Sequence, residues 1–129
     1  MSELPVVYSA GGKYNNSKVE VDGYTFDSMA EYRRYVELKM LAQAGTITEL
    51  IVHPLYELQP AFRTADGKRE RAICYEGDFE YQENGQWIVE DVKGQETDVW
   101  KLKRKLFLAN YPTAVLRVTP AGRYSKKGR

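Results

Sequence analysis

The chain has 129 residues, of which 43% are hydrophobic and 29% charged, which predicts one globular domain with a modest core. One cysteine excludes an intramolecular disulfide and a thiolate zinc site, and one histidine excludes a nuclease built on several histidines. If the chain is an enzyme, carboxylates and lysines must carry its chemistry. No apolar run approaches the roughly 18 residues of a membrane span, and no secretory signal is present. We therefore expect a cytoplasmic protein.

The net charge of +1 hides an uneven distribution of charge along the chain. Residues 1–100 contain 10 Lys and Arg against 18 Asp and Glu, whereas residues 101–129 contain nine Lys and Arg and no acid. This asymmetry is typical of a protein that meets a polyanion with one part and can bind a cation with another. A basic tail that only keeps the protein soluble is the alternative.

Apolar periodicity and turn residues predict strands, a helix, more strands, a second helix and a last strand. The expected elements are a hairpin at 18–26, a helix at 28–44, strands at 47–52 and 55–58, a turn at 64–67, a long strand at 69–81, a strand at 86–93, a helix at 98–109 and a strand at 114–118. Residues 1–12 and 122–129 are expected to be loose ends. This order predicts a single α+β domain of the α/β/α type, with a mixed central sheet flanked by helices.

Each predicted helix has a marked start and an apolar stripe. The spacing of Ser28 and Glu31 is that of a capping box, and Glu31 also lies at the head of the first helix's apolar stripe. In the second helix the predicted core-facing stripe is Val99, Leu102, Leu106 and Ala109. That stripe leaves a basic face of Lys101, Lys103, Arg104 and Lys105. This face either contacts DNA phosphates or is simply solvated.

The strongest turn signal in the chain is Asn84-Gly85, which predicts a two-residue hairpin loop. In that register Asp78 faces Asp91, and Lys93 lies on the same face of its strand as Asp91. Like charges directly opposite each other destabilise a sheet, but Mg²⁺ or Mn²⁺ bound between them reverses the sign. Solvated acids on a hairpin, and a Glu31 that only caps its helix, are the alternatives.

Two segments resemble a known signature at this point. Gly77-Asp78-Phe79 followed by residues 88–93 resembles the motif of the PD-(D/E)XK nuclease superfamily, with Gly77 in place of the proline. More of the chain, residues 13–118, resembles a family of small phage-encoded proteins known as a domain of unknown function and thought to include Holliday-junction resolvases. The segments that carry this resemblance are residues 18–23, 26–28 with Glu31, and 89–94. Glu90 creates an ambiguity of register, and the two-residue spacing to Lys93 favours Asp91.

The resemblance implies a restriction-endonuclease-like fold and a DNA endonuclease that leaves 5′-phosphate ends. It assigns catalysis to Glu31, Asp78, Asp91 and Lys93, with the three carboxylates holding Mg²⁺, for which Mn²⁺ would substitute. Gln95 would contact these residues and hold them in position without binding the metal ion itself. The implied partner is branched or four-way-junction DNA cut by a homodimer, in the host cytoplasm if a phage encodes the chain. A general, flap- or nick-directed nuclease and a non-catalytic DNA-binding module remain alternatives.

Overall fold

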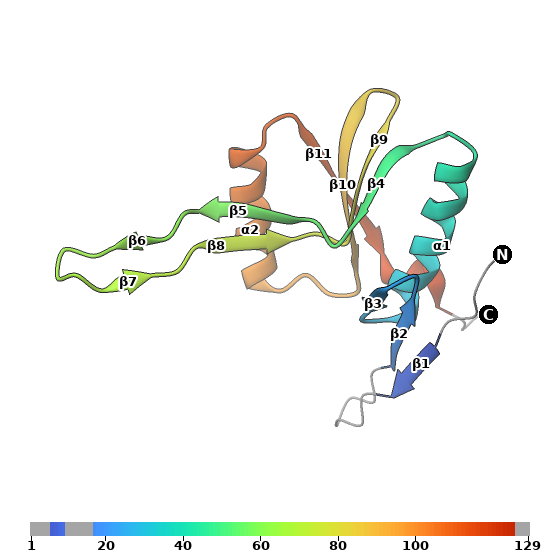
Figure 1. The fold of residues 1–129 in the computed structure, drawn as a ribbon, viewed down its shortest axis with the longest axis horizontal. Coiled ribbons are helices and arrows are strands. Elements are labelled where there is room, and N and C mark those ends of the chain that lie inside the picture. Colours follow the sequence, from blue (N-terminus) through green and yellow to red (C-terminus); the bar gives the residue numbers. More distant parts are fainter. Residues whose placement is uncertain (1–5, 10–16, 126–129) are drawn as a thin grey trace.

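The computed structural model describes residues 6–9 and 17–125. A four-stranded sheet lies at the centre of this structure (Figure 1). The elements are β1 (Val6–Ser9), β2 (Ser17–Val21), β3 (Tyr24–Phe26), α1 (Met29–Gln43), β4 (Thr48–Val52), β5 (Leu55–Gln59), β6 (Phe62–Arg63), β7 (Arg69–Glu70), β8 (Ile73–Glu76), β9 (Phe79–Glu83), β10 (Gln86–Lys93), α2 (Asp98–Asn110), β11 (Ala114–Pro120) and the 3-10 helix η1 (Ala121–Tyr124). The predicted α+β architecture is confirmed.

The central sheet has the strand order β11-β10-β9-β4. β10 pairs with β11 in parallel and with β9 antiparallel, so the sheet is mixed as predicted. The β9–β10 hairpin has the predicted register, from Gln86 opposite Glu83 to Glu90 opposite Phe79. Its turn residues, Asn84 and Gly85, have φ of 52° and 78°, which is the backbone of the tight turn that this dipeptide favours.

Side chains of β10 alternate between two cores because successive residues of a strand point to opposite faces. Ile88 packs in one cluster with Leu38 of α1, and this cluster also contains the N-terminal hairpin β2–β3. Val89 packs in a second cluster with Phe107 of α2 and with residues of β5 and β8. One helix therefore covers each face of the sheet.

Helix α1 begins and ends where the sequence predicts. The side-chain oxygen of Ser28 accepts a hydrogen bond of 3.1 Å from the backbone N–H of Glu31, which caps the helix start. At the other end Gly45 has φ of 82°, and the N–H of Thr46 donates to the carbonyl of Leu41. A glycine suits this position because the left-handed backbone is strained for other residues.

Helix α2 has the predicted bounds to within one residue, but of its predicted buried stripe only Leu106 packs against the core. Val99 and Leu102, expected in the core, are 64% and 59% exposed. Trp100 and Phe107 are buried instead. They are seven residues apart and hence on one side of the helix, and their large rings turn that side toward the sheet.

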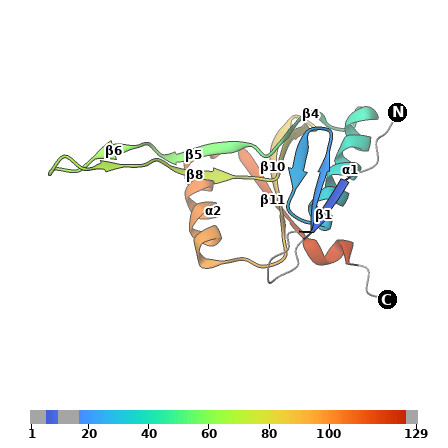
Figure 2. The same cartoon turned by 60° about the horizontal axis from the view of Figure 1, so that its bottom comes forward.

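The predicted long strand at residues 69–81 is wrong, because the chain changes sheets at Gly77 and Asp78. β8 pairs with β5 in a separate two-stranded sheet, whereas β9 joins the central sheet. At the change, the N–H of Gly77 donates to the carbonyl of Pro54 and the N–H of Asp78 donates to that of Glu90. Residues 55–76 form a ribbon, here called the arm. Its inner part, β5 and β8, packs against α2, and its outer half, β6 and β7 with the turn between them, extends away from the body of the molecule (Figures 1 and 2).

Regular secondary structure extends further toward both ends of the chain than predicted. Within residues 1–12, Val6–Ser9 form β1, which pairs with β2. Within residues 122–129, η1 is held against α1, because Arg33 donates to the carbonyl of Tyr124 and the hydroxyl of Tyr124 donates to Glu37. The rest of the two predicted loose ends, residues 1–5, 10–12 and 126–129, lies outside the described residues.

The described part of the chain contains no helix that is both long enough and apolar enough to cross a membrane.

Candidate active site

A pocket of about 340 Å³ lies where the arm, the start of α1 and the strand β10 come together. It is lined by Thr25, Asp27, Glu31, His53, Glu76, Asp78, Asp91 and Lys93. All four residues predicted as catalytic are among them. They come from separate parts of the chain: the first turn of α1, the bend before β9, and the end of β10.

Glu31 caps its helix, as its spacing to Ser28 predicts, and it also lines the pocket. One carboxylate oxygen accepts a hydrogen bond of 3.1 Å from the backbone N–H of Asp27, just before the helix. The other lies 2.8 Å from the Nε2 atom of His53. Glu31 is buried, and its carboxylate lines the pocket. Capping the helix therefore fixes the carboxylate at the pocket wall.

Asp78 reaches the pocket in a different way from the one predicted. The β9–β10 ladder ends at Phe79, so Asp78 is not paired with Asp91 across the strands. Its side chain instead accepts a hydrogen bond of 2.6 Å from the N–H of Val92. Burial, and then the nearby carboxylates of Glu31 and Asp91, raise the pKa of Asp78 to about 9. The three carboxylates therefore lie close enough together to disfavour the ionised form of Asp78.

Asp91 and Lys93 lie on one face of β10, as their spacing predicts. Asp91 is 3% exposed, and its Oδ2 atom accepts hydrogen bonds from the hydroxyl of Tyr75 and from the indole N–H of Trp100, the latter at 3.0 Å. The ammonium of Lys93 lies 3.6 Å from Oδ1 of Asp91 and 5.4 Å from the centre of the Trp100 ring. Burial and Asp91 raise the pKa of Tyr75, so its phenol remains a donor.

Glu90, the other acid of the ambiguous pair, points to the opposite face of β10. It is fully buried and makes two hydrogen bonds with Arg34, at 2.7 and 3.1 Å. Tyr81 and Thr119 also donate to its carboxylate. Its charge is balanced within the core, whereas Asp91 faces the pocket. The position of the two side chains agrees with the assignment of Asp91 from its spacing to Lys93.

His53 is the main pocket residue that the sequence reasoning missed. Besides the contact with Glu31, its backbone N–H donates to the carbonyl of Asp78, and its φ is 58°. Residues other than glycine uncommonly adopt this left-handed backbone conformation. Asp27, Glu76 and Thr25 were also missed. The available signal for His53 was its position as the sole histidine, directly before Pro54 and between two strands.

The donor types in the pocket fit a hard divalent cation, since Glu31, Asp78 and Asp91 supply carboxylate oxygens. Among residues 6–9 and 17–125, however, no three His, Cys, Asp or Glu side chains are already grouped as a metal site. Their hydrogen bonds explain this: both oxygens of Glu31, and Oδ2 of Asp91, are turned toward partners in the protein. These side chains would have to rotate to bring their oxygens around one ion.

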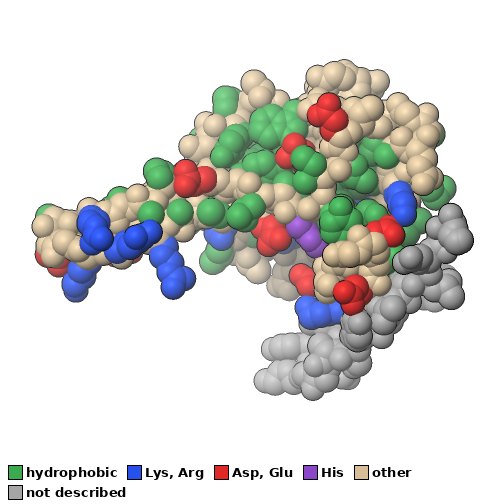
Figure 3. All heavy atoms as spheres, in the orientation of Figure 1, with side chains coloured by type: hydrophobic (Ala, Val, Ile, Leu, Met, Phe, Trp, Pro, Cys, Tyr) green, Lys and Arg blue, Asp and Glu red, His purple; other side chains and the backbone are tan. Residues whose placement is uncertain are grey.

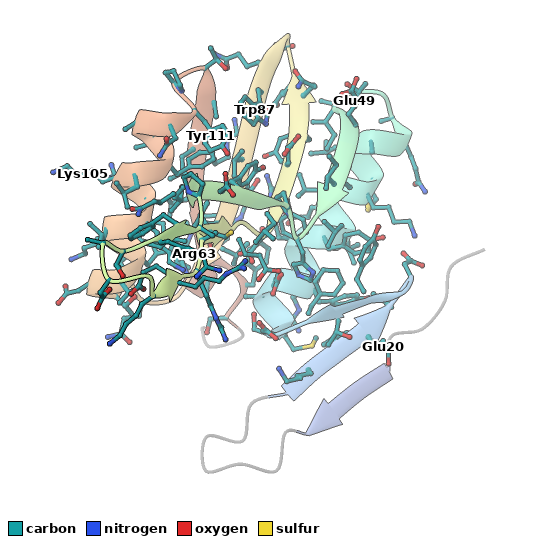
Figure 4. All side chains as sticks on the ribbon, turned by 60° about the vertical axis from the view of Figure 1, so that its left-hand side comes forward. Glu20, Glu49, Arg63, Trp87, Lys105 and Tyr111 are labelled. Carbon is teal, nitrogen blue, oxygen red and sulfur yellow. The ribbon has the colours of Figure 1, made fainter. Side chains whose placement is uncertain are left out.

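The other predicted site residues lie outside the pocket. Lys101, Arg104 and Lys105 are exposed on α2 and Lys103 is half-buried, so this basic face is accessible to a polyanion. Figure 4 shows Lys105 projecting from α2 away from the sheet. Gln95 is exposed in the loop after β10 and does not line the pocket. The side chains that hold Asp91 in position by hydrogen bonds are instead those of Tyr75 and Trp100.

Asp78→Asn is expected to stabilise the metal-free protein at neutral and alkaline pH. A raised folded-state pKa means that the native protein retains a proton that the unfolded chain releases, so wild-type stability falls between about pH 4 and pH 9. An amide cannot ionise and can still accept from Val92. We expect a gain on the order of 2 kcal/mol at pH 8, or about 7 °C in melting temperature, and little gain at pH 4. Thermal melts in EDTA at both pH values measure it, and a lower melting temperature at pH 8 would contradict it.

Comparison with known proteins relates the chain to one family. No curated protein and no solved structure matched it. A family model covers residues 11–126, which is nearly the whole chain and includes every residue of the pocket. The chain belongs to the family described as "Protein of unknown function (DUF1064)".

Proposed function

We propose that the chain is a metal-dependent DNA endonuclease, selective for branched DNA, and that it acts as a resolvase of four-way junctions. The observation that carries this proposal is the pocket in which Glu31, Asp78 and Asp91 meet Lys93. Four residues chosen from sequence, from three separate parts of the chain, line one pocket of about 340 Å³. The carboxylates lie close together, and their proximity helps to raise the pKa of Asp78. This is the arrangement expected where a cation is bound.

In this proposal Glu31, Asp78 and Asp91 hold Mg²⁺, and Mn²⁺ would substitute for it. Bound there, the cation would supply Lewis acidity, which promotes ionisation of water and neutralises charge on the phosphate. Tyr75 and Trp100 hold one oxygen of Asp91, which leaves its Oδ1 atom toward Lys93 and the pocket. Glu31 differs, because Asp27 and His53 engage both of its oxygens, so its side chain would have to rotate to bind the cation. The contacts to Oδ2 of Asp91 therefore position one carboxylate in advance.

Lys93 provides the positive charge of the site. Its ammonium can orient the attacking water by hydrogen bonding, and it stabilises the negative charge that develops on the phosphate. The oxygen of water bonds to phosphorus as the bond from phosphorus to the 3′ oxygen breaks. A proton passes to that 3′ oxygen, leaving a 5′-phosphate and a 3′-hydroxyl. Holding the ammonium between Asp91 and the Trp100 ring limits its motion and prepares it for this role.

Junction selectivity and a homodimer belong to the proposal because resolving a four-way junction requires two symmetric cuts. The exposed basic face of α2 supplies phosphate contacts that read no sequence. Such a protein acts where DNA is, in the cytoplasm, or in the host cytoplasm if a phage encodes it. A non-catalytic DNA-binding module would gain nothing from three carboxylates in one pocket, since they repel DNA.

The test is cleavage of a labelled synthetic four-way junction, beside a matched linear duplex and a flap, in Mg²⁺ and in EDTA. The proposal predicts paired, symmetric cuts in the junction alone, in Mg²⁺ alone, with 5′-phosphate products. Mass measurement by light scattering should give a dimer. Equal cutting of all three substrates would demote the resolvase to a general nuclease. Absence of cleavage with either Mg²⁺ or Mn²⁺ would overturn the proposal.

A further inference from the structure

We infer that the outer half of the arm, residues 61–71, is a DNA-contacting surface separate from the basic face of α2, and that it binds the sugar-phosphate backbone of the duplex that enters the pocket. This inference rests on the proposed function, because it names where the DNA of that reaction is held. Its first support is position. Glu76, the last residue of β8, lines the pocket, so the arm starts at the pocket wall. DNA whose phosphate lies in the pocket would have the arm beside it.

The arm has the shape of a projecting two-stranded ribbon. β5 pairs with β8 near the body and β6 with β7 toward the tip. The turn at the tip is closed by hydrogen bonds between Thr64 and Lys68. Glu76 lies nine positions after Gly67 in the sequence, which at about 3.3 Å per residue gives a reach of roughly 30 Å. Figures 1 and 2 show that no other element accompanies the outer half. A two-stranded ribbon of this kind fits the major groove of DNA.

The charge of the outer half is positive and is not balanced within the protein. Its exposed basic residues are Arg63, Lys68, Arg69 and Arg71, against two acids, Asp66 and Glu70. Throughout the described residues, no ion pair joins any of these four bases to a carboxylate. Figure 3 shows Lys and Arg side chains gathered along this projection. The surface therefore suits a polyanion and disfavours a second copy of itself.

Two like charges face each other near the tip. Arg63 lies directly opposite Arg69 in the β6–β7 ladder, an arrangement that destabilises a sheet unless an anion lies between the side chains. Both also line a hollow of about 250 Å³ with Ala61 and Phe62, and Phe62 is 47% exposed. Guanidinium groups bind phosphate oxygens in pairs, and an adjacent apolar ring suits a sugar. Figure 4 shows Arg63 on the arm, set apart from Lys105 on α2.

The test is DNA binding by a double variant, Arg63→Gln with Arg69→Gln, in EDTA so that no cleavage occurs. Fluorescence anisotropy with labelled duplex and four-way junction is recorded over a series of NaCl concentrations. If both residues contact phosphates, we expect about tenfold weaker binding and a salt dependence, log Kd against log salt, shallower by about 2. The matched control is Arg33→Gln with Lys39→Gln, which removes two charges from α1 and should bind as wild type does.

The outcomes separate the arm from the nuclease. Equal affinity and salt dependence in wild type and the arm variant would overturn the inference and leave the proposed function untouched. A changed oligomeric mass without a changed salt dependence would show that the arm holds a second copy, and would also overturn it. Arm-dependent DNA binding without cleavage would support the inference while overturning the nuclease. A wild type that binds no DNA would overturn both.

Discussion

Asp91→Asn is expected to lower the rate of DNA cleavage by at least about 10³-fold, which corresponds to ~4 kcal/mol of transition-state stabilisation. The substitution removes one of three carboxylate charges that we propose hold the metal ion. It keeps the shape of the side chain, and the amide oxygen can still accept from Tyr75 and Trp100. The loss should therefore appear in turnover rather than in folding. Single-turnover cleavage of the four-way junction in Mg²⁺ measures it.

The matched control is Asp98→Asn, which removes a carboxylate at the exposed start of α2, outside the pocket. It should cleave as wild type does. Lys93→Met should match Asp91→Asn in lost cleavage and should retain metal binding, since its ammonium is not a ligand. An Asp91→Asn protein that is folded and cleaves at a rate near that of wild type would remove Asp91 from the active site.

Arg34→Met is expected to destabilise the protein by about 3–5 kcal/mol, because it leaves the charge of Glu90 in the core without its cation. Glu90 is completely buried, and Arg34 is the cation that pairs with it. The remaining donors, Tyr81 and Thr119, are neutral hydroxyls. Urea unfolding followed by circular dichroism measures the free energy of unfolding. A loss of this size is a large part of the stability of a small domain.

Arg33→Met is the control on the same helix. It removes one hydrogen bond, to the carbonyl of Tyr124, and should cost about 1 kcal/mol. The double variant Arg34→Met with Glu90→Leu should recover much of the lost stability, since it removes both charges together. If Arg34→Met unfolds no more easily than Arg33→Met, Glu90 does not depend on this ion pair. The proposal that Glu90 is structural while the adjacent Asp91 is functional would then fail.

Local signals predicted much of this fold. The Asn84-Gly85 turn needs only its own backbone conformation, so it fixed the register of β9 and β10 correctly. The Ser28 cap and Gly45 likewise act within one turn of helix, and both ends of α1 were predicted. Alternation along β10 placed Asp91 and Lys93 together for the same reason. Each of these features depends on neighbours in sequence.

The errors arise where distant parts of the chain decide the structure. Asp78 meets Asp91 because the chain changes sheets between β8 and β9, a bend fixed by hydrogen bonds to Pro54 and Glu90. Nothing near residue 77 in the sequence reveals those partners. The buried side of α2 was missed because Phe107 packs against Tyr56 of β5 and Tyr75 of β8, which are far away in the sequence. The contact of His53 with Glu31 joins residues 22 apart. For the residues of the arm, the sequence predicted only strands and a turn, and not a projecting ribbon.

Calorimetric titration of Mn²⁺ into the metal-free protein tests the central claim, that the carboxylate pocket is a divalent-metal centre. Wild type, Asp78→Asn and Asp98→Asn would be compared at one pH and ionic strength. The account predicts saturable binding to wild type and to Asp98→Asn, and its loss in Asp78→Asn, which should be folded and at least as stable without metal. Binding that is equal in all three proteins, or absent from wild type, would contradict it.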